Sequence, residues 1–342
     1  MKLFINQSSA EQLIKGASLF TTGGGVPLSD QKLTLSKIKN LKTRVFSLDL
    51  FPKTGYLCTA AELGPTDVPP LKKDHLIKKM LDLLTKTTGK KVVGLYPPEI
   101  GQESVVIESA SLLNLPIADF DPVGFRAVPF IDINVFNLKK LPFSYTPMAV
   151  ASDKGEIFLI DGRVSYERLE TILRKMTEYS KSGVVFLLGG LLSVNNLIKN
   201  RLETNSLSRA YDFGRINSLT DLLKQLNPVL TLNATVIKKS EFKQQGFLGE
   251  VINLTDNNKR KYKLVILNET IFLLDANKKI LAQVPQRILL IDPVKIQGLS
   301  GVFLARGQKI CVAVIPPEKQ WQTPKVNELF GKDRFSFILK NL

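Results

Sequence analysis

Residues 92–121, VVGLYPPEIGQESVVIESASLLNLPIADFD, contain two short apolar runs separated by a stretch with helical spacing. The runs at 92–96 and 116–121 have the length and composition of buried strands, and residues 103–113 repeat apolar side chains at the period of a helix. A strand, a helix and a second strand with short joints form a parallel crossover. We therefore expect an α/β protein whose N-terminal domain contains parallel βαβ units and flanking helices.

Acidic side chains follow both of these strands. Glu99 lies in the loop after the first strand, and Asp119 and Asp121 stand at the end of the second. Ligands of open α/β sheets bind beyond the carboxyl ends of the strands. A carboxylate at that edge can act as a general base or hold a hard cation, and the alternative for each aspartate is that it caps the following turn. Glu99, Asp119 and Asp121 are therefore candidate site residues.

Asp121 is the predicted key acidic group. It directly precedes Pro122, which forces an extended backbone and ends the strand, whereas Asp119 comes two residues earlier and is expected to be held at the end of the sheet. Arg126 is near enough along the chain to bind Asp121 or a substrate carboxylate through its guanidinium. The alternative for Arg126 is an ordinary salt bridge.

A glycine loop provides the second part of the predicted site. Thr22, Gly23, Gly24 and Gly25 follow the first predicted helix, and a second predicted helix begins soon after them. Consecutive glycines can turn several backbone N–H groups toward an anion or a carbonyl, and a helix N-terminus favours negative charge. The alternative is a helix C-cap, which needs only one glycine. The loop follows a helix and has no P-loop lysine, so we expect no nucleotide cofactor.

The second half of the chain becomes almost wholly β after residue 228. We expect a domain at 1–165 and a C-terminal α+β domain at 166–342 that ends in a β-rich region, with residue 228 as the alternative boundary. Within that region the polar pair Asn268 and Glu269 interrupts the apolar sequence LVILNETIFLL. The pair is either a hairpin turn or a polar intrusion into a cleft between the two domains, and both residues are candidate ligand contacts.

The composition of the chain argues against several classes of function. The chain has 342 residues, 44% hydrophobic and 23% charged, with a formal charge of +16 spread over many lysines. We interpret that charge as a solubility feature and do not expect nucleic-acid binding. The single histidine, His75, and two cysteines provide no histidine-rich zinc site and make a Ser-His-Asp triad a poor explanation. No apolar run is long enough to cross a membrane, and we expect a cytoplasmic protein.

Taken together, several stretches resemble one family, the S-methyl-thiohydantoin desulfurase-like family, formerly a domain of unknown function and associated with hydantoinase and oxoprolinase genes. The resembling stretches come in the family's order: GASLFTTGGG (16–25), PPEIGQES (97–104), LPIADFDPVGFRAVP (115–129), SLSRAYDFGRI (206–216), LVILNETIFLLDANKKILAQVPQRILLID (264–292) and the ending around Trp321, Thr323 and Phe335. The chain departs from the family pattern where Thr21 and Val26 replace loop glycines, where Phe130 replaces an acidic residue, and near Gln286, where an aspartate is expected.

The resemblance implies a hydrolase-type enzyme that exchanges sulfur for oxygen on a hydantoin- or thiohydantoin-like ring, or opens a cyclic amide. Asp121 or Glu99 would deprotonate the attacking water, and the glycine-loop amides and Arg126 would stabilise the developing negative charge. The alternative is a non-catalytic ligand-binding or regulatory protein that keeps the pocket. A small-molecule ligand and hydantoinase- or oxoprolinase-type partners are expected, while a divalent cation held by carboxylates and a homo-oligomer are left open.

Overall fold

The first of two sheets is mixed and contains the predicted parallel strands. The computed structural model describes residues 2–64, 75–200, 202, 205–244, 247–330 and 334–335. The strands of this sheet, in spatial order, are β1 (Lys2–Ile5), β2 (Thr43–Phe46), β5 (Ile117–Ala118), β4 (Val92–Tyr96), β3 (Tyr56–Leu63), β8 (Val185–Ser193), β6 (Met148–Ala151) and β7 (Ile157–Ile160). Strands β2, β5, β4 and β3 are parallel neighbours, and all the other pairs are antiparallel.

The predicted strand–helix–strand unit is confirmed. Leu95 of β4 pairs in parallel with Ile117 of β5, and α4 (Glu103–Leu113) connects the two strands. Strand β5 ends at Ala118, so Asp119 and Asp121 lie in the loop beyond the strand and not within it. The acidic residues of both loops therefore leave the sheet at its carboxyl edge, as the parallel arrangement requires.

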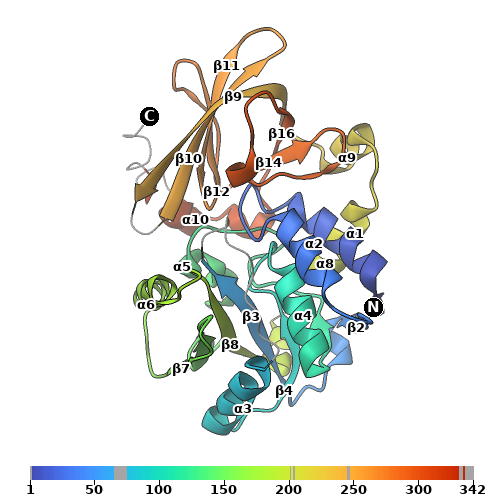
Figure 1. Ribbon diagram of the computed structural model, residues 1–342, viewed down its shortest axis with the longest axis vertical. Helices are drawn as coiled ribbons and strands as arrows, with labels where there is room; N and C mark the ends of the chain where they lie inside the picture. Colours follow the sequence, from blue (N-terminus) through green and yellow to red (C-terminus); the bar gives the residue numbers. More distant parts are fainter. Residues whose placement is uncertain are drawn as a thin grey trace.

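Helices cover both faces of this sheet, and the second sheet lies beyond its carboxyl edge (Figure 1). The helices are α1 (Gln7–Ser18), α2 (Leu28–Ser36), α3 (Ile77–Thr88), α4, α5 (Ile131–Asn134), α6 (Tyr166–Tyr179), α7 (Val194–Lys199), α8 (Ser206–Gly214), α9 (Leu219–Leu226) and α10 (Pro324–Phe330). A core of aliphatic side chains fills the space between α1, α3, α4 and the sheet. None of the helices in the described ranges is long and apolar enough to span a membrane.

The second sheet is antiparallel throughout its described strands. Its spatial order is β13 (Ile280–Gln283), β12 (Glu269–Asp275), β11 (Lys261–Leu267), β10 (Phe247–Asp256), β9 (Leu230–Gln244), β16 (Lys309–Ile315), β14 (Arg287–Asp292) and β15 (Gln297–Gly298). Strand β8, although it follows residue 165, belongs to the first sheet. The two sheets thus divide the chain near residue 228, and the domain boundary at 165 stays a prediction about folding units.

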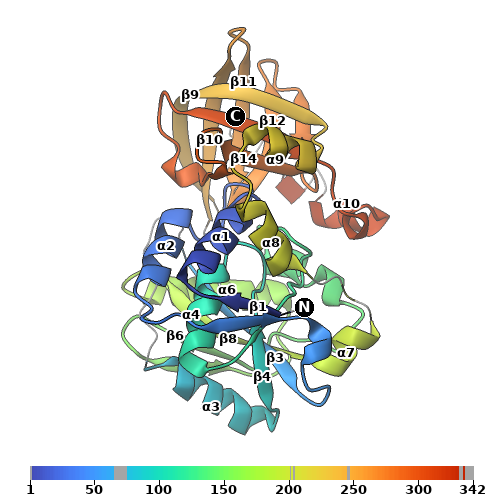
Figure 2. The same cartoon turned by 90° about the vertical axis from the view of Figure 1, so that its right-hand side faces the viewer.

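Helix α1 holds the two sheets together, as Figure 2 shows from the side. It lies directly against α8, because a Cβ atom at Gly16 would come 1.7 Å from the carbonyl oxygen of Ala210. Its last residue contacts the second sheet, where the Gly298 N–H donates to Ser18 Oγ at 2.9 Å. The backbone contact at Gly16 therefore sets the position of the helix that joins the two halves.

We predict that Gly16→Ala destabilises the protein by about 1–3 kcal/mol, because the added methyl group must push α1 and α8 apart. Urea denaturation measures the change. The control is Gly307→Ala, whose Cβ would meet no atom within 4 Å and whose left-handed backbone alone costs about 1 kcal/mol. Equal losses in the two variants would contradict the proposed role of the helix contact.

Candidate functional site

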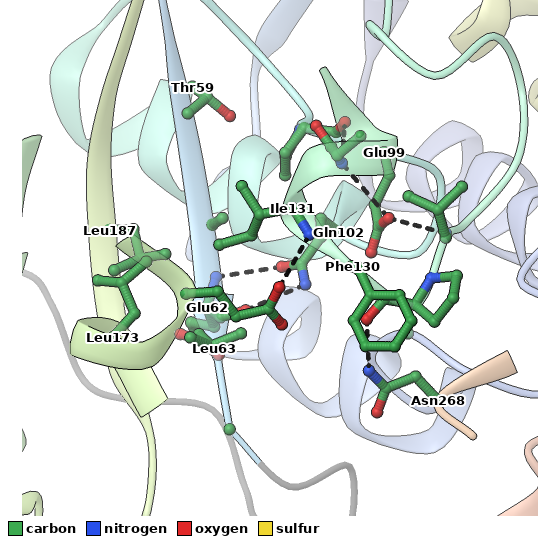
Figure 3. Close-up of a pocket in the computed structure, with 18 of the residues that line it drawn as sticks. Thr59, Glu62, Leu63, Glu99, Gln102, Phe130, Ile131, Leu173, Leu187 and Asn268 are labelled. Atoms are coloured by element: carbon green, nitrogen blue, oxygen red, sulfur yellow. Dashed lines mark hydrogen bonds between the residues drawn. The ribbon is translucent and has the colours of Figure 1, made fainter. Parts of the chain in front are cut away.

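A cavity of about 160 Å³ lies at the carboxyl edge of the first sheet. Its walls come from the ends of β3 and β4, from the loop before α5, from α6, and from the turn between β11 and β12 (Figure 3). Pockets for drug-sized ligands begin at roughly 300 Å³, so this cavity suits a much smaller molecule. Most of the wall is apolar, and the polar side chains that line it include Glu62, Glu99, Gln102, Asn134, Tyr145, Glu170, Arg174, Asn268 and Glu269.

Glu99 reaches the cavity from the loop after β4. One carboxyl oxygen accepts from the Val128 N–H at 3.0 Å and from Asn134 Nδ2 at 3.5 Å. Among the residues drawn in Figure 3, none is hydrogen-bonded to the other oxygen, which points into the cavity. Burial, with a smaller contribution from the nearby Asp121 carboxyl, raises the pKa of Glu99 to about 8 against the effect of those two hydrogen bonds. Glu99 is thus a carboxyl with a free oxygen and a pKa near neutrality, as a general base requires.

Glu269 reaches the same cavity from the second sheet. It is the first residue of β12, and its exposed fraction is 3%. Within the described chain its Oε2 atom has no hydrogen-bond partner. Burial raises the pKa of Glu269 well above its usual range, and the Glu99 carboxyl raises it further, whereas Arg126 and Arg174 lower it. Two carboxyl groups, one from each half of the chain, therefore line one small cavity.

Asn268 forms the tight turn that presents Glu269. Its φ of 61° lies in the left-handed region, and its side-chain amide donates to the Pro129 carbonyl at 3.2 Å. Leu267 and Glu269 pair across this turn. Both sequence interpretations of the polar pair hold, because the pair is a turn between strands and also projects into the space between the two sheets.

Asp119 lies outside the cavity lining and caps α8. Its carboxylate accepts from the backbone N–H groups of Leu207 at 2.9 Å and Ser208 at 3.1 Å, and from Ser208 Oγ at 2.6 Å. These are the unsatisfied donors of a helix N-terminus. The structure therefore gives Asp119 a helix-capping position, and its contact with a ligand stays a prediction.

Asp121 also lies outside the cavity lining. It accepts backbone N–H bonds from Val123 at 2.9 Å, Gly124 at 2.7 Å and Phe125 at 2.9 Å. Burial raises its pKa to about 6 although these bonds favour the charged form. Both oxygens are occupied in holding the loop that leads to Arg126. The catalytic role predicted for Asp121 would require this turn to open.

Arg126 is buried behind the cavity wall. Its Nη1 atom donates to the Pro285 carbonyl at 2.7 Å, and its guanidinium carbon lies 5.4 Å and 5.0 Å from the ring centroids of Trp321 and Phe330. Burial lowers the pKa of Arg126 to about 10. The guanidinium therefore joins the loop after β5 to the second half of the chain, and its action on a substrate stays a prediction.

Only Gly25 of the glycine loop lines the cavity. The Thr22 carbonyl accepts from both the N–H and the hydroxyl of Thr270, each at 2.7 Å, and the Gly23 carbonyl accepts from the Gly301 N–H at 3.0 Å. A Cβ atom at Gly24 would lie 2.1 Å from the Asn268 carbonyl oxygen. The glycines thus let the loop pass close to the second sheet, and ligand contact by Thr22, Gly23 and Gly24 stays a prediction.

The polar cavity residues that were not predicted from the sequence include Asn134, Tyr145, Glu170 and Arg174. The Tyr145 hydroxyl donates to Asn134 Oδ1, and Asn134 in turn contacts Glu99. Glu170 of α6 accepts from the Ile131 N–H and pairs with Arg174 at 3.2 Å. The amphipathic pattern of α6 was the only available signal for the last two. In the described ranges, no group of three or more His, Cys, Asp or Glu side chains is placed to hold a metal ion.

Comparisons with known proteins agree over the whole chain. The model of the S-Me-THD-like N-terminal domain matches residues 8–162, and that of the S-Me-THD-like C-terminal domain matches residues 164–341. A crystal structure of a protein from Chromobacterium violaceum superposes with a TM-score of 0.76 at 20% identity, covering 98% of this chain and 97% of that one. At this identity the likeness shows the fold alone. No curated protein matches the chain.

We predict that Asp121→Asn destabilises the protein by about 1–3 kcal/mol, because one carboxylate oxygen becomes an NH₂ group that faces a fixed backbone N–H. Asp119→Asn is the matched control. Its Oδ2 faces the Ser208 hydroxyl, which can rotate to accept a hydrogen bond. We expect it to lose less than about 1 kcal/mol. Chemical denaturation of both variants tests this difference, and an Asp121→Asn variant as stable as wild type would refute it.

Proposed function

Because the chain belongs to the S-Me-THD-like family, we propose that it is a hydrolase-type enzyme that acts on a hydantoin- or thiohydantoin-like ring. The observation that carries the proposal is the free oxygen of Glu99 in a small, mostly apolar cavity at the carboxyl edge of the sheet. A five-membered ring fits a cavity of this size, and the apolar wall would shield a reacting water from bulk solvent.

Glu99 is the proposed base. Its ionised carboxyl would take a proton from a water that attacks the electrophilic ring carbon. In the exchange of sulfur for oxygen, a C–O bond forms, the C–S bond breaks, and Glu99 returns the proton to the departing sulfur. The hydroxyl of the intermediate loses its remaining proton to water as the new C=O bond forms. In the opening of an amide, the C–N bond breaks and the nitrogen receives that proton. The Val128 N–H and Asn134 hold the carboxyl in place.

The remaining sequence-based roles stay part of the proposal. Arg126 and the loop at Gly25 would stabilise negative charge, Asp121 would serve as an alternative base, and hydantoinase- or oxoprolinase-type proteins would be partners in the cytoplasm. No step is assigned to a metal ion.

One observation favours a second function, that of a ligand-binding protein without turnover. Phe130 stands where the family pattern places an acidic residue, and it lines the cavity. Its ring stacks on Phe335 at a centroid distance of 6.0 Å, and the Arg334 guanidinium carbon lies 4.5 Å from the Phe130 ring centroid. An apolar side chain held in that position would leave the pocket without one acid. Assays of ring turnover and of ring binding by the same preparation separate the two functions.

We predict that Glu99→Gln lowers kcat on the order of 100-fold or more, because the amide cannot accept the proton from water. In the wild type, kcat/KM should rise with pH through the pKa of Glu99, about 8, because the base acts only when ionised. Hydantoins and thiohydantoins are the substrates to screen.

The control for this variant is Asp121→Asn, assayed at a temperature where it remains folded. Wild-type turnover by Glu99→Gln together with a large loss of turnover in Asp121→Asn would show that Asp121, and not Glu99, is the base. Binding of a ring by the wild type with no turnover of any ring would favour the binding protein.

A further inference from the structure

Glu269 is a buried cavity residue for which the proposed reaction has no role. Only 3% of its surface is exposed, and in the described part of the chain its Oε2 atom lacks a hydrogen-bond partner. A buried polar atom without a partner costs free energy, on the order of 1–3 kcal/mol. Glu269 also lines the cavity, which places its carboxyl beside any ligand bound there.

The surroundings of Glu269 favour its neutral form. Charged groups face it from three elements: Glu99 from the loop after β4, Arg126 from the loop after β5, and Glu170 with Arg174 from α6. Arg174 pairs with Glu170, and Arg126 donates to the Pro285 carbonyl, so both cations already have acceptors. Burial and the Glu99 carboxyl both disfavour a second negative charge in the cavity. A neutral carboxyl presents one O–H donor and one acceptor oxygen.

We propose that Glu269 binds the ligand ring as a protonated carboxyl, accepting a hydrogen bond from a ring N–H and donating one to the adjacent C=O or C=S. The choice of ring rests on the proposed function. Two-point pairing requires an N–H and a carbonyl on the same side of one amide bond. A ring enforces that cis arrangement, whereas acyclic amides are almost always trans. Glu269 is thereby a specificity residue for neutral cyclic amides and thioamides.

The same pairing would place the ring for attack. The donated hydrogen bond draws electron density from the ring carbonyl, and the Glu99 carboxyl lines the same cavity. Anionic ligands are disfavoured beside the ionised Glu99 carboxyl, because like charges repel strongly in a mostly apolar cavity. The site should therefore prefer neutral rings to carboxylates or phosphates of similar size.

The experiment measures binding and turnover together by ligand-observed NMR, with hydantoin, its fully N-methylated derivative and acyclic N-methylacetamide as probes. The wild type should bind hydantoin and should bind the other two roughly 10- to 100-fold more weakly, the loss expected for one or two hydrogen bonds. Glu269→Leu should lose affinity for hydantoin by a similar factor. Glu269→Gln keeps one donor and one acceptor, so it should retain most of the affinity.

The matched control is Glu250→Gln. Glu250 is a second glutamate of the same sheet with a buried Oε2 atom that lacks a hydrogen-bond partner in the described chain, but it lies outside the cavity lining. This variant should bind hydantoin like the wild type. A Glu269→Gln variant as weak as Glu269→Leu, equal binding of the N-methylated ring, or no binding of hydantoin by the wild type would each overturn the proposal. Binding without product would leave this proposal standing and refute only the hydrolase.

Discussion

The two hydrogen bonds from Thr270 to the Thr22 carbonyl fix how the halves of the molecule meet at the cavity. They join the glycine loop of the first half to β12 of the second, one residue after Glu269. Gly24 permits this approach, since any larger residue would meet the Asn268 carbonyl. If this junction were looser, Glu269 would not be held in the cavity wall that Glu99 also lines. The glycine loop therefore acts on the site through backbone packing between two sheets.

The four carboxylates predicted for the site fall into two groups that differ in their partners. Asp119 and Asp121 are saturated by backbone N–H groups and hold a helix end and a tight loop in place. In the described part of the chain Glu269 Oε2 has no hydrogen-bond partner, and one oxygen of Glu99 has no hydrogen bond to the residues drawn in Figure 3. Desolvation raises the pKa of all four, so a raised pKa alone does not distinguish them. The free oxygens, together with the cavity that these side chains line, separate reactive candidates from structural ones.

The sequence predicted what local patterns determine. The two apolar runs and the helical repeat within residues 92–121 were sufficient to predict the parallel strand–helix–strand unit. The polar pair at 268–269 could be identified because it interrupts an apolar strand. The roles of Asp119 and the α6 residues depend on long-range packing. The Asp119 partners Leu207 and Ser208 are almost ninety positions away in the sequence, and no residue near Asp119 indicates these contacts. Arg174 and Glu170 look like ordinary surface residues of an amphipathic helix until α6 is placed over the cavity. The site is therefore harder to predict than the fold, because its contacts join residues that lie far apart in the sequence.

The protonation states of Glu99 and Glu269 depend on each other, because the two carboxyls line the same small cavity. If both were ionised, two negative charges would share a small apolar space, and the cations nearest to them already have other acceptors. One proton shared between the pair removes that repulsion. In such a pair the carboxyl that loses its proton first becomes the base, and the carboxyl that keeps its proton acts as a hydrogen-bond donor. Because Val128 and Asn134 donate to Glu99 and stabilise its charged form, Glu99 is the group that ionises first, and Glu269, which lacks such donors on Oε2, keeps the proton.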